Sequence, residues 1–188
     1  NMDPDLMASV AQADPDNAHG VIYLWGTNGI AYNPAKVAER MGPDFTLDSW
    51  ATVFDPAVAS KLADCGITML DSASEMIPLV LNYLGLPPGS TESADLEKAA
   101  ETLAAVRPYI RYFNSSQYLS DLANGEICAA VGYSGDVFIA AARAEEAKTG
   151  VEVAFNIPKE GALQWFDLMA IPSDAPNPEG AHAWINFV

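Results

Sequence analysis

Short apolar runs alternate with helical segments along most of the chain, and this alternation constrains the fold more than any other feature. "VIYLWGTNGIAYN" predicts two short strands around Gly26 to Gly29, and further strands are predicted at "ITML", "YIRYF", "ICAAVGY", "VEVAFNIP" and "LQWFDLMAIP". Helical segments lie between most of them, with start and stop signals such as Pro34 and Gly42. The pattern predicts an α/β fold with a mostly parallel sheet flanked by helices.

The length and composition predict a globular protein, and length alone allows one large domain or two small ones. The chain has 188 residues, half of them hydrophobic, and the proline-rich stretches "LPPGSTES" and "SDAPNPEG" are too short to be interdomain linkers. No apolar segment reaches the roughly 20 residues of a membrane helix, so membrane insertion is not expected. The start at Asn1 and the unterminated helix "GAHAWINFV" predict a piece excised from a longer protein.

The net charge restricts the partners. The 25 acidic and 9 basic residues give a formal charge of −16, which argues against binding to nucleic acid or an anionic membrane. A cationic ligand or a basic partner is permitted. The acidity is equally consistent with a role in solubility alone, because net charge does not locate a site.

Carboxylates and aromatic rings follow three of the predicted strands. Glu75 comes after "ITML", Tyr133 and Asp136 come after "ICAAVG", and Trp165 and Asp167 lie within "LQWFDLMAIP". Ligands of open α/β sheets bind at the carboxyl ends of the strands. If these side chains converge, they suit an organic ammonium, because a cation is attracted both by a ring face and by a carboxylate.

Asp167 interrupts an apolar run, which makes the two faces of that strand unequal. Side chains alternate in a strand, so Trp165 and Asp167 share one face. Phe166, Leu168 and Ala170 lie on the other face, which we expect to be buried under helices. A buried carboxylate needs a partner, so the face of Asp167 requires a separate explanation.

Each of the other polar positions also has a purely structural interpretation. Ser72 and Glu75 have the spacing of a capping box, and Asp136 at a helix start is favoured by the helix dipole. Ser115 or Ser116 is placed to cap the helix that follows. Spacing alone favours these local roles for the serines and for Glu75.

The sequence offers little support for an enzyme. His19 and His182 are expected to be solvated, and the common nucleophile, phosphate-loop, zinc and dinucleotide motifs are missing from the sequence. We therefore expect no catalytic residue, no cofactor and no metal. The alternative is a metal-assisted hydrolase that uses Glu75, Asp136 and Asp167.

Cys65 and Cys128 are too far apart in the sequence for a CxxC motif. Composition leaves two possibilities open, a disulfide or two buried thiols.

Long colinear stretches resemble the bacterial periplasmic polyamine-binding proteins, especially the putrescine-binding type. They are "YLWGTNGIAYNPAKV", "CGITMLDSASEM", "VLNYLGLPPGST", "RPYIRYFNSSQYLSDLANGEICAAVGYSGDV", "IPKEGALQWFDLMAIPSDA" and "AHAWINFV". The resemblance covers nearly the whole chain. It implies a periplasmic receptor that delivers putrescine or spermidine to the membrane permease of an ABC importer.

The resemblance also implies an architecture, the type II periplasmic-binding-protein fold with two α/β lobes that close over the ligand. Residues 1–188 look like a single lobe, the second, with hinge strands near 21–33 and C-terminal to 172. An isolated lobe should bind polyamine weakly, since half of the contacts are missing. A further alternative is an inert excised lobe, made for folding or assembly studies.

Individual residues match the family's ligand contacts. Glu75, Asp136 and Asp167 match its amine-binding carboxylates, whereas Tyr133 and Trp165 match its aromatic walls. Two further matches are Ser115, a weaker one, and the pair Cys65 and Cys128, which matches a disulfide of the putrescine type. The family usually has Trp at the place of Tyr133, whereas Trp165 looks more like the spermidine-preferring members, so the ligand is left open.

Overall fold

The computed structural model describes residues 3–188. Its helices are α1 (Pro4–Val10), α2 (Pro34–Met41), α3 (Ala51–Phe54), α4 (Pro56–Leu62), α5 (Ala73–Tyr83), α6 (Ser93–Val106), α7 (Gln117–Ala123), α8 (Ser134–Glu146) and α9 (Pro178–Ile185), with 3-10 turns η1 (Pro15–Asn17) and η2 (Arg107–Tyr109). The strands are β1 (Val21–Tyr32), β2 (Ile67–Met69), β3 (Ile110–Phe113), β4 (Ala129–Tyr133), β5 (Ala154–Asn156) and β6 (Gln164–Met169).

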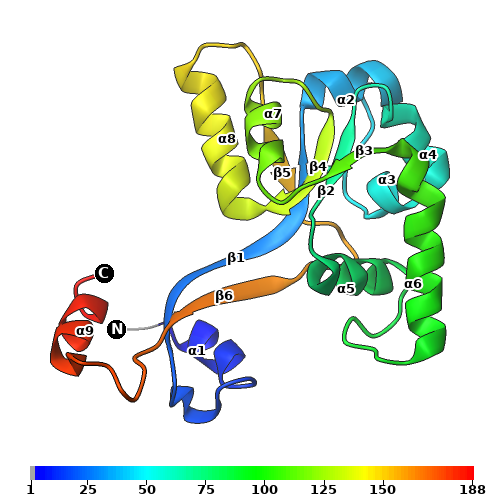
Figure 1. The fold of residues 1–188 in the computed structure, drawn as a ribbon. Helices are drawn as coiled ribbons and strands as arrows, with labels where there is room; N and C mark the ends of the chain where they lie inside the picture. Colours follow the sequence, from blue (N-terminus) through cyan, green and yellow to red (C-terminus); the bar gives the residue numbers. More distant parts are fainter. Residues whose placement is uncertain (1–2) are drawn as a thin grey trace. The chain divides into compact units, whose positions relative to one another are not determined.

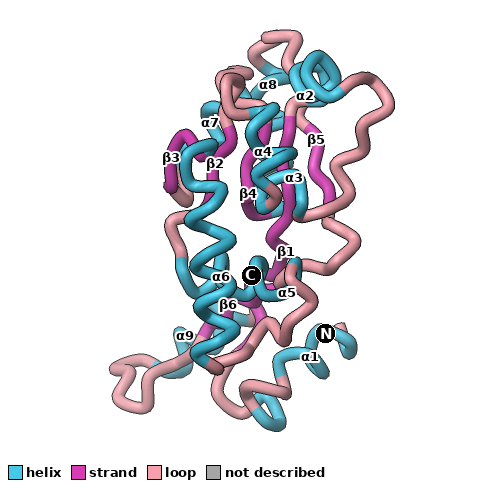
Figure 2. Tube along the Cα trace, turned by 90° about the vertical axis from the view of Figure 1, so that its right-hand side faces the viewer, coloured by secondary structure: helices cyan, strands magenta, loops and turns pink. Residues whose placement is uncertain are grey.

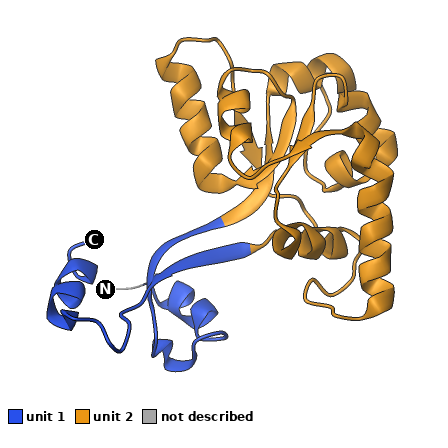
Figure 3. Ribbon diagram, viewed as in Figure 1, with its two compact units in different colours: residues 1–26, 164–188 blue, residues 27–163 orange. Residues whose placement is uncertain are grey.

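The chain divides into two compact units, coloured separately in Figure 3. Unit 1 comprises residues 1–26 and 164–188, and unit 2 is the continuous segment 27–163. The first boundary falls inside β1, within the predicted hinge region 21–33. The second lies before β6, upstream of the crossing predicted after Pro172. The assignment of the whole chain to one lobe stays a prediction.

The sheet has the strand order β3-β2-β4-β1-β5, and β6 pairs with β1. β2 runs parallel to both β3 and β4. β1 runs antiparallel to β4 and to β5, with Asn28 directly opposite Tyr133. The predicted α/β class is confirmed, and the sheet is mixed because β1 runs against the direction of its neighbours.

Helices cover both faces of the sheet in unit 2. In Figures 1 and 2, α7 and α8 lie on one face and α3, α4 and α6 on the other. Helix α7 packs on α8, and α6 packs on α3, α4 and α5. The hydrophobic core lies between these layers, and its largest fully buried side chains include Trp50, Tyr118 and Phe54.

Local signals set several helix starts. Asn33, Asp55 and Asn177 each accept a hydrogen bond from a first-turn N–H of the helix that follows, and each of those helices has proline in its first turn. Proline suits this position, because its missing N–H would have no partner inside the helix. The predicted boundary signals at Pro34 and Gly42 are therefore confirmed.

Three local expectations are wrong. "VIYLWGTNGIAYN" forms one strand of 12 residues rather than two short ones, because the backbone stays extended through Gly26 and Gly29. Leu168 is 43% exposed and Ala170 is also exposed, so that face of β6 is not buried under helices. Residues Ser72 and Ser116 stand at the starts of α5 and α7 without capping them through their side chains.

A buried polar contact fixes the loop after β5 to the start of α3. The Glu160 carboxylate accepts hydrogen bonds from the Ser49 hydroxyl and, at 3.1 Å, from the Trp50 backbone N–H. The Trp50 indole N–H donates to the Gly161 carbonyl at 2.7 Å, and the Asn82 side chain donates to the Glu160 carbonyl at 2.6 Å. These contacts join three separate segments of unit 2.

Cys65 and Cys128 form a disulfide, as the resemblance implies. Their Cα atoms are 5.4 Å apart, a usual separation for bonded cysteines. The bond joins the segment before β2 to the segment before β4. In the described part of the chain, no helix combines the length and the apolar character that a membrane crossing requires.

Candidate functional site

Both carboxylate oxygens of Glu75 accept hydrogen bonds from the sheet. Glu75 lies in the first turn of α5, where its Oε2 accepts from the Tyr133 hydroxyl at 2.8 Å and its Oε1 accepts from the Asn28 Nδ2 at 3.2 Å. Asn28 and Tyr133 are opposite residues of β1 and β4, and opposite residues project from the same face of a sheet. The carboxylate is thereby held in a fixed orientation.

A second carboxylate is connected to the same tyrosine through the backbone. The buried hydroxyl of Tyr118 on α7 donates to Asp136 Oδ2 at 2.7 Å and accepts from the Tyr133 backbone N–H at 3.0 Å. The Tyr118 ring lies against Gly132, where an added Cβ would come within 2.5 Å of the ring. Glu75 is therefore bonded to the Tyr133 side chain, and Asp136 is linked to the Tyr133 backbone through the Tyr118 hydroxyl.

Ser115 also belongs to this group of contacts. Its hydroxyl oxygen accepts a hydrogen bond from the Asp71 backbone N–H at 2.9 Å, which joins the segment after β3 to the segment after β2. Its side chain also hydrogen-bonds with the Tyr133 phenol. The Ser115 hydroxyl thus binds outside α7; the first N–H groups at the start of that helix, those of Ser116 and Gln117, are bound by Asn114 Oδ1.

The environment keeps the tyrosine hydroxyls protonated. Burial, reinforced by the Glu75 carboxylate, raises the pKa of Tyr133 to about 12. Burial likewise raises the pKa of Tyr118, and the hydrogen bond to Asp136 acts in the same direction. A phenol with a raised pKa remains a donor at neutral pH. Both hydroxyls therefore orient carboxylates without competing with them for a cation.

The other two predicted site residues lie in unit 1, on β6. Trp165 is half-buried and Asp167 is exposed. Their alternate positions on one strand put them on the same face, as predicted. The structure thus brings together Glu75, Tyr133, Asp136 and Ser115 within unit 2, and it places Trp165 and Asp167 next to one another within unit 1.

Sequence reasoning missed two members of the unit 2 site. Asn28 lies in a run that predicts only a strand, and Tyr118 lies in a segment that predicts only a helix. The local roles favoured for Glu75 and Asp136 are incomplete, since both bind side chains distant in the sequence. The sequence contains no motif that points to Asn28, because its contact with Glu75 depends on where β1 lies in the sheet.

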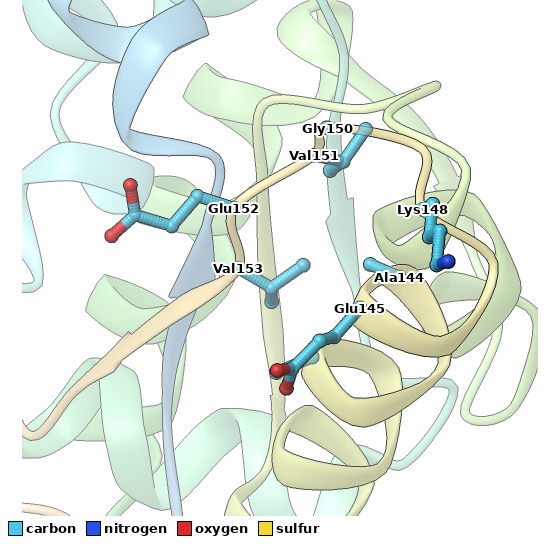
Figure 4. Close-up of a pocket in the computed structure, with 8 residues that line it drawn as sticks. Ala144, Glu145, Lys148, Gly150, Val151, Glu152 and Val153 are labelled. Carbon is cyan, nitrogen blue, oxygen red and sulfur yellow. The ribbon is translucent and has the colours of Figure 1, made fainter.

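One hollow of about 530 Å³ lies away from these residues, where the end of α8 meets the loop before β5 (Figure 4). The charged ends of Glu145, Lys148 and Glu152 are separated there and do not converge on one point. Among residues 3–188, no three His, Cys, Asp or Glu side chains gather in a way that could hold a metal ion. The polar groups around Tyr133 lie elsewhere in unit 2.

A fold alone does not establish a function, so the class of protein is taken from the similarity to known families. The model of the bacterial extracellular solute-binding protein family matches residues 1–188. The chain belongs to this family.

Two putrescine-binding proteins are similar in sequence to this chain over its whole length. It is 50% identical to the putrescine-binding periplasmic protein SpuD of Pseudomonas aeruginosa and 48% identical to the putrescine-binding periplasmic protein PotF of Escherichia coli. Each alignment covers 100% of this chain and 51% of the relative. The chain therefore spans about half the length of these relatives.

Solved structures confirm the fold. The TpPotD lipoprotein of Treponema pallidum superimposes with a TM-score of 0.81 at 28% identity, over 99% of this chain and 54% of that one. The spermidine/putrescine substrate-binding protein PotD of Streptococcus pneumoniae gives a TM-score of 0.77 at 27% identity, over 100% and 52%. The predicted type II periplasmic-binding-protein fold class is confirmed.

Proposed function

We propose that this chain is part of a periplasmic receptor that binds putrescine or spermidine for an ABC importer. Glu75 and Asp136 neutralise ammonium groups, and the Tyr133 ring lies against the ligand. Trp165 and Asp167 supply a second ring and a third carboxylate. Ser115 supports Tyr133, and the longer protein delivers the ligand to its membrane permease.

One observation carries the proposal. Glu75 accepts a hydrogen bond from the Tyr133 hydroxyl at 2.8 Å, and Asp136 accepts one at 2.7 Å from the Tyr118 hydroxyl, which also binds the Tyr133 backbone N–H. Two oriented carboxylates beside a ring suit a ligand with positive charges on an apolar carbon chain. The names of the relatives support the same class of ligand, because SpuD and PotF are both described as putrescine-binding.

The periplasmic location is supported by three observations. The family is described as extracellular, the named relatives are periplasmic, and Cys65 is bonded to Cys128. Disulfides persist in oxidising compartments, of which the bacterial periplasm is one.

Calorimetry tests the ligand class. Putrescine, spermidine, cadaverine and agmatine are titrated into the 188-residue chain and into a longer protein in which it is continued to the length of its relatives. We expect the longer protein to bind at least one of them and the 188-residue chain to bind it much more weakly, since part of the contacts is absent.

Two variants locate the site. Glu75→Gln keeps the size of the side chain and removes its charge, and should weaken polyamine binding by the longer protein by about tenfold or more. Glu152→Gln makes the same change at an exposed position of unit 2 and should leave the affinity unchanged. If the longer protein bound none of the four amines, the proposal would be contradicted.

A further inference from the structure

The Asp136 carboxylate is held by a single hydrogen-bond donor. Asp136 lies in the first turn of α8 and is only partly buried, and its Oδ2 accepts from the Tyr118 hydroxyl at 2.7 Å. Its Oδ1 receives no hydrogen bond from a described residue and is not fully shielded from solvent. Glu75, by contrast, has two donors, Asn28 and Tyr133. The orientation of Asp136 therefore depends on one hydroxyl, while its second oxygen is accessible to a ligand.

The Tyr118 hydroxyl can donate in only one direction. It carries one proton, and it accepts the Tyr133 backbone N–H at 3.0 Å, so its proton points away from that donor and toward Asp136. The Tyr133 N–H lies at the end of β4, which pairs with β1 and with β2. The Asp136 side chain is thereby held relative to the sheet, and not only relative to its own helix.

Packing fixes the ring that carries this hydroxyl. The Tyr118 side chain is fully buried. A Cβ added to Gly132 of β4 would come within 2.5 Å of the ring and within 3.1 Å of the hydroxyl oxygen. Any side chain at position 132 would therefore displace the ring, and with it the donor of Asp136. Gly132 is thus required for the position of the Tyr118 hydroxyl.

We propose that Tyr118 is a positioning residue of the polyamine site, which touches no ligand and holds Asp136 in the orientation that receives an ammonium group. This inference rests on the proposed binding of polyamines and extends it to a residue in the interior of unit 2. A carboxylate that is oriented before the ligand arrives does not have to be ordered on binding, so more of the attraction to the ammonium contributes to affinity. If Tyr118 instead served stability alone, its effect on affinity would not depend on Asp136.

A double-mutant cycle in the longer protein separates these two roles, with putrescine affinity measured by calorimetry. Tyr118→Phe keeps the buried ring and removes the hydroxyl, and should weaken putrescine binding by about 5- to 30-fold. Asp136→Asn should also weaken binding, because the charge is lost. In the Asp136→Asn background, Tyr118→Phe should lower the affinity further by less than about twofold, since residue 136 no longer carries the charge that Tyr118 orients.

Tyr112→Phe is the matched control. The Tyr112 hydroxyl donates to Asp121 Oδ2 at 2.5 Å, so unit 2 contains a second tyrosine–aspartate pair, which makes no hydrogen bond to Tyr133. Removing this hydroxyl should lower the thermal unfolding midpoint and leave the putrescine affinity unchanged. The comparison distinguishes the loss of a stabilising hydrogen bond from the loss of recognition.

The phenol of Tyr118 gives a readout that needs no substitution of Tyr118. In the longer protein labelled with carbon-13 at the tyrosine Cζ atoms, saturating putrescine should shift the Tyr118 resonance, because the carboxylate that accepts its proton then also binds an ammonium. The shift should be much smaller in Asp136→Asn, and the Tyr112 resonance should stay in place in both proteins.

Three results would overturn the role of Tyr118. They are an unchanged putrescine affinity in Tyr118→Phe or in Asp136→Asn, an equal loss on Tyr118→Phe in both backgrounds, and a Tyr118 resonance that putrescine does not shift. Absence of any amine binding by the wild-type longer protein would instead overturn the proposed function.

Discussion

Glu75 illustrates what a single residue's spacing can and cannot indicate. Its distance from Ser72 predicts a capping box, yet Ser72 makes no side-chain cap and Glu75 accepts hydrogen bonds from Asn28 and Tyr133 instead. These donors lie 47 and 58 residues away along the chain. A capping motif involves only residues within one helical turn. It therefore cannot predict hydrogen-bond donors, such as Asn28 and Tyr133, that lie on strands of the sheet.

Ionisation of the Tyr133 phenol should lower the stability of the folded chain at alkaline pH. Folding raises its pKa from about 10 to about 12, so the folded state holds this proton more tightly than the unfolded state. The resulting stabilisation is complete below about pH 10 and is lost as the pH rises through about 12. The free energy of unfolding of the wild type should therefore fall between about pH 9 and pH 11.5. Tyr133→Phe has no phenol to ionise, so its free energy of unfolding should fall less over the same interval.

Urea unfolding at these two pH values measures the effect. Tyr118 and Tyr112 also have raised pKa values, so the variant should lose only part of the dependence. Tyr109→Phe removes a hydroxyl that makes no hydrogen bond with a described residue and serves as the control. If the free energy of unfolding of Tyr133→Phe fell with pH as much as that of the wild type, the claim that burial and Glu75 raise the pKa of Tyr133 would be wrong.

At the scale of elements, the sequence predicted most of the helices and strands because their signals are local. Proline and asparagine or aspartate at helix starts, and apolar runs between them, need only neighbouring residues to be interpreted. The division of β1 was wrong for the opposite reason. Gly26 and Gly29 suggest a break, but pairing of β1 with β4 and β5 keeps the backbone extended through residues 28–32.

The contact between Glu160 and the start of α3 should contribute measurably to stability. Glu160→Ala removes an acceptor from the Ser49 hydroxyl and the Trp50 N–H, next to a fully buried indole. We expect the free energy of unfolding to fall by about 1.5–3 kcal/mol, the range for hydrogen bonds to charged groups. Urea denaturation measures it.

Glu152→Ala is the matched control for this substitution, because Glu152 is an exposed glutamate of unit 2 in the loop before β5. Its effect should stay within about 0.5 kcal/mol. Equal effects of the two substitutions would mean that the Glu160 contacts contribute nothing beyond a surface carboxylate.

At the scale of the whole molecule, the candidate site could be predicted only through the resemblance. Composition and spacing indicated that Glu75, Asp136 and Asp167 suit a cation if they converge, but spacing alone favoured a local capping role for Glu75. Which side chains approach one another depends on strand order, and the order β3-β2-β4-β1-β5 is not encoded in any short motif. Asn28 is recognisable only once β1 is placed beside β4.

The division into two units leads to a prediction about folding. Unit 2 is continuous from residue 27 to residue 163, and it contains the hydrophobic core, the disulfide and the hydrogen bonds of Glu75 and Asp136. In unit 1, the buried hydrophobic side chains among the described residues are Val10 and Ile22. Cooperative stability scales with buried apolar area, so it should reside in unit 2.

A shortened chain of residues 27–163 should therefore fold independently and unfold in one cooperative transition. In the 188-residue chain, amide hydrogens of α1 and α9 should exchange well before those of β2 and β4, because few buried contacts oppose their local opening. Hydrogen exchange followed by mass spectrometry measures the order, and circular dichroism of the shortened chain measures the transition. Loss of the transition on shortening, or protection of α9 equal to that of β4, would mean that the two units depend on each other for stability. The unit 2 half of the candidate site would then require the rest of the chain to keep its geometry.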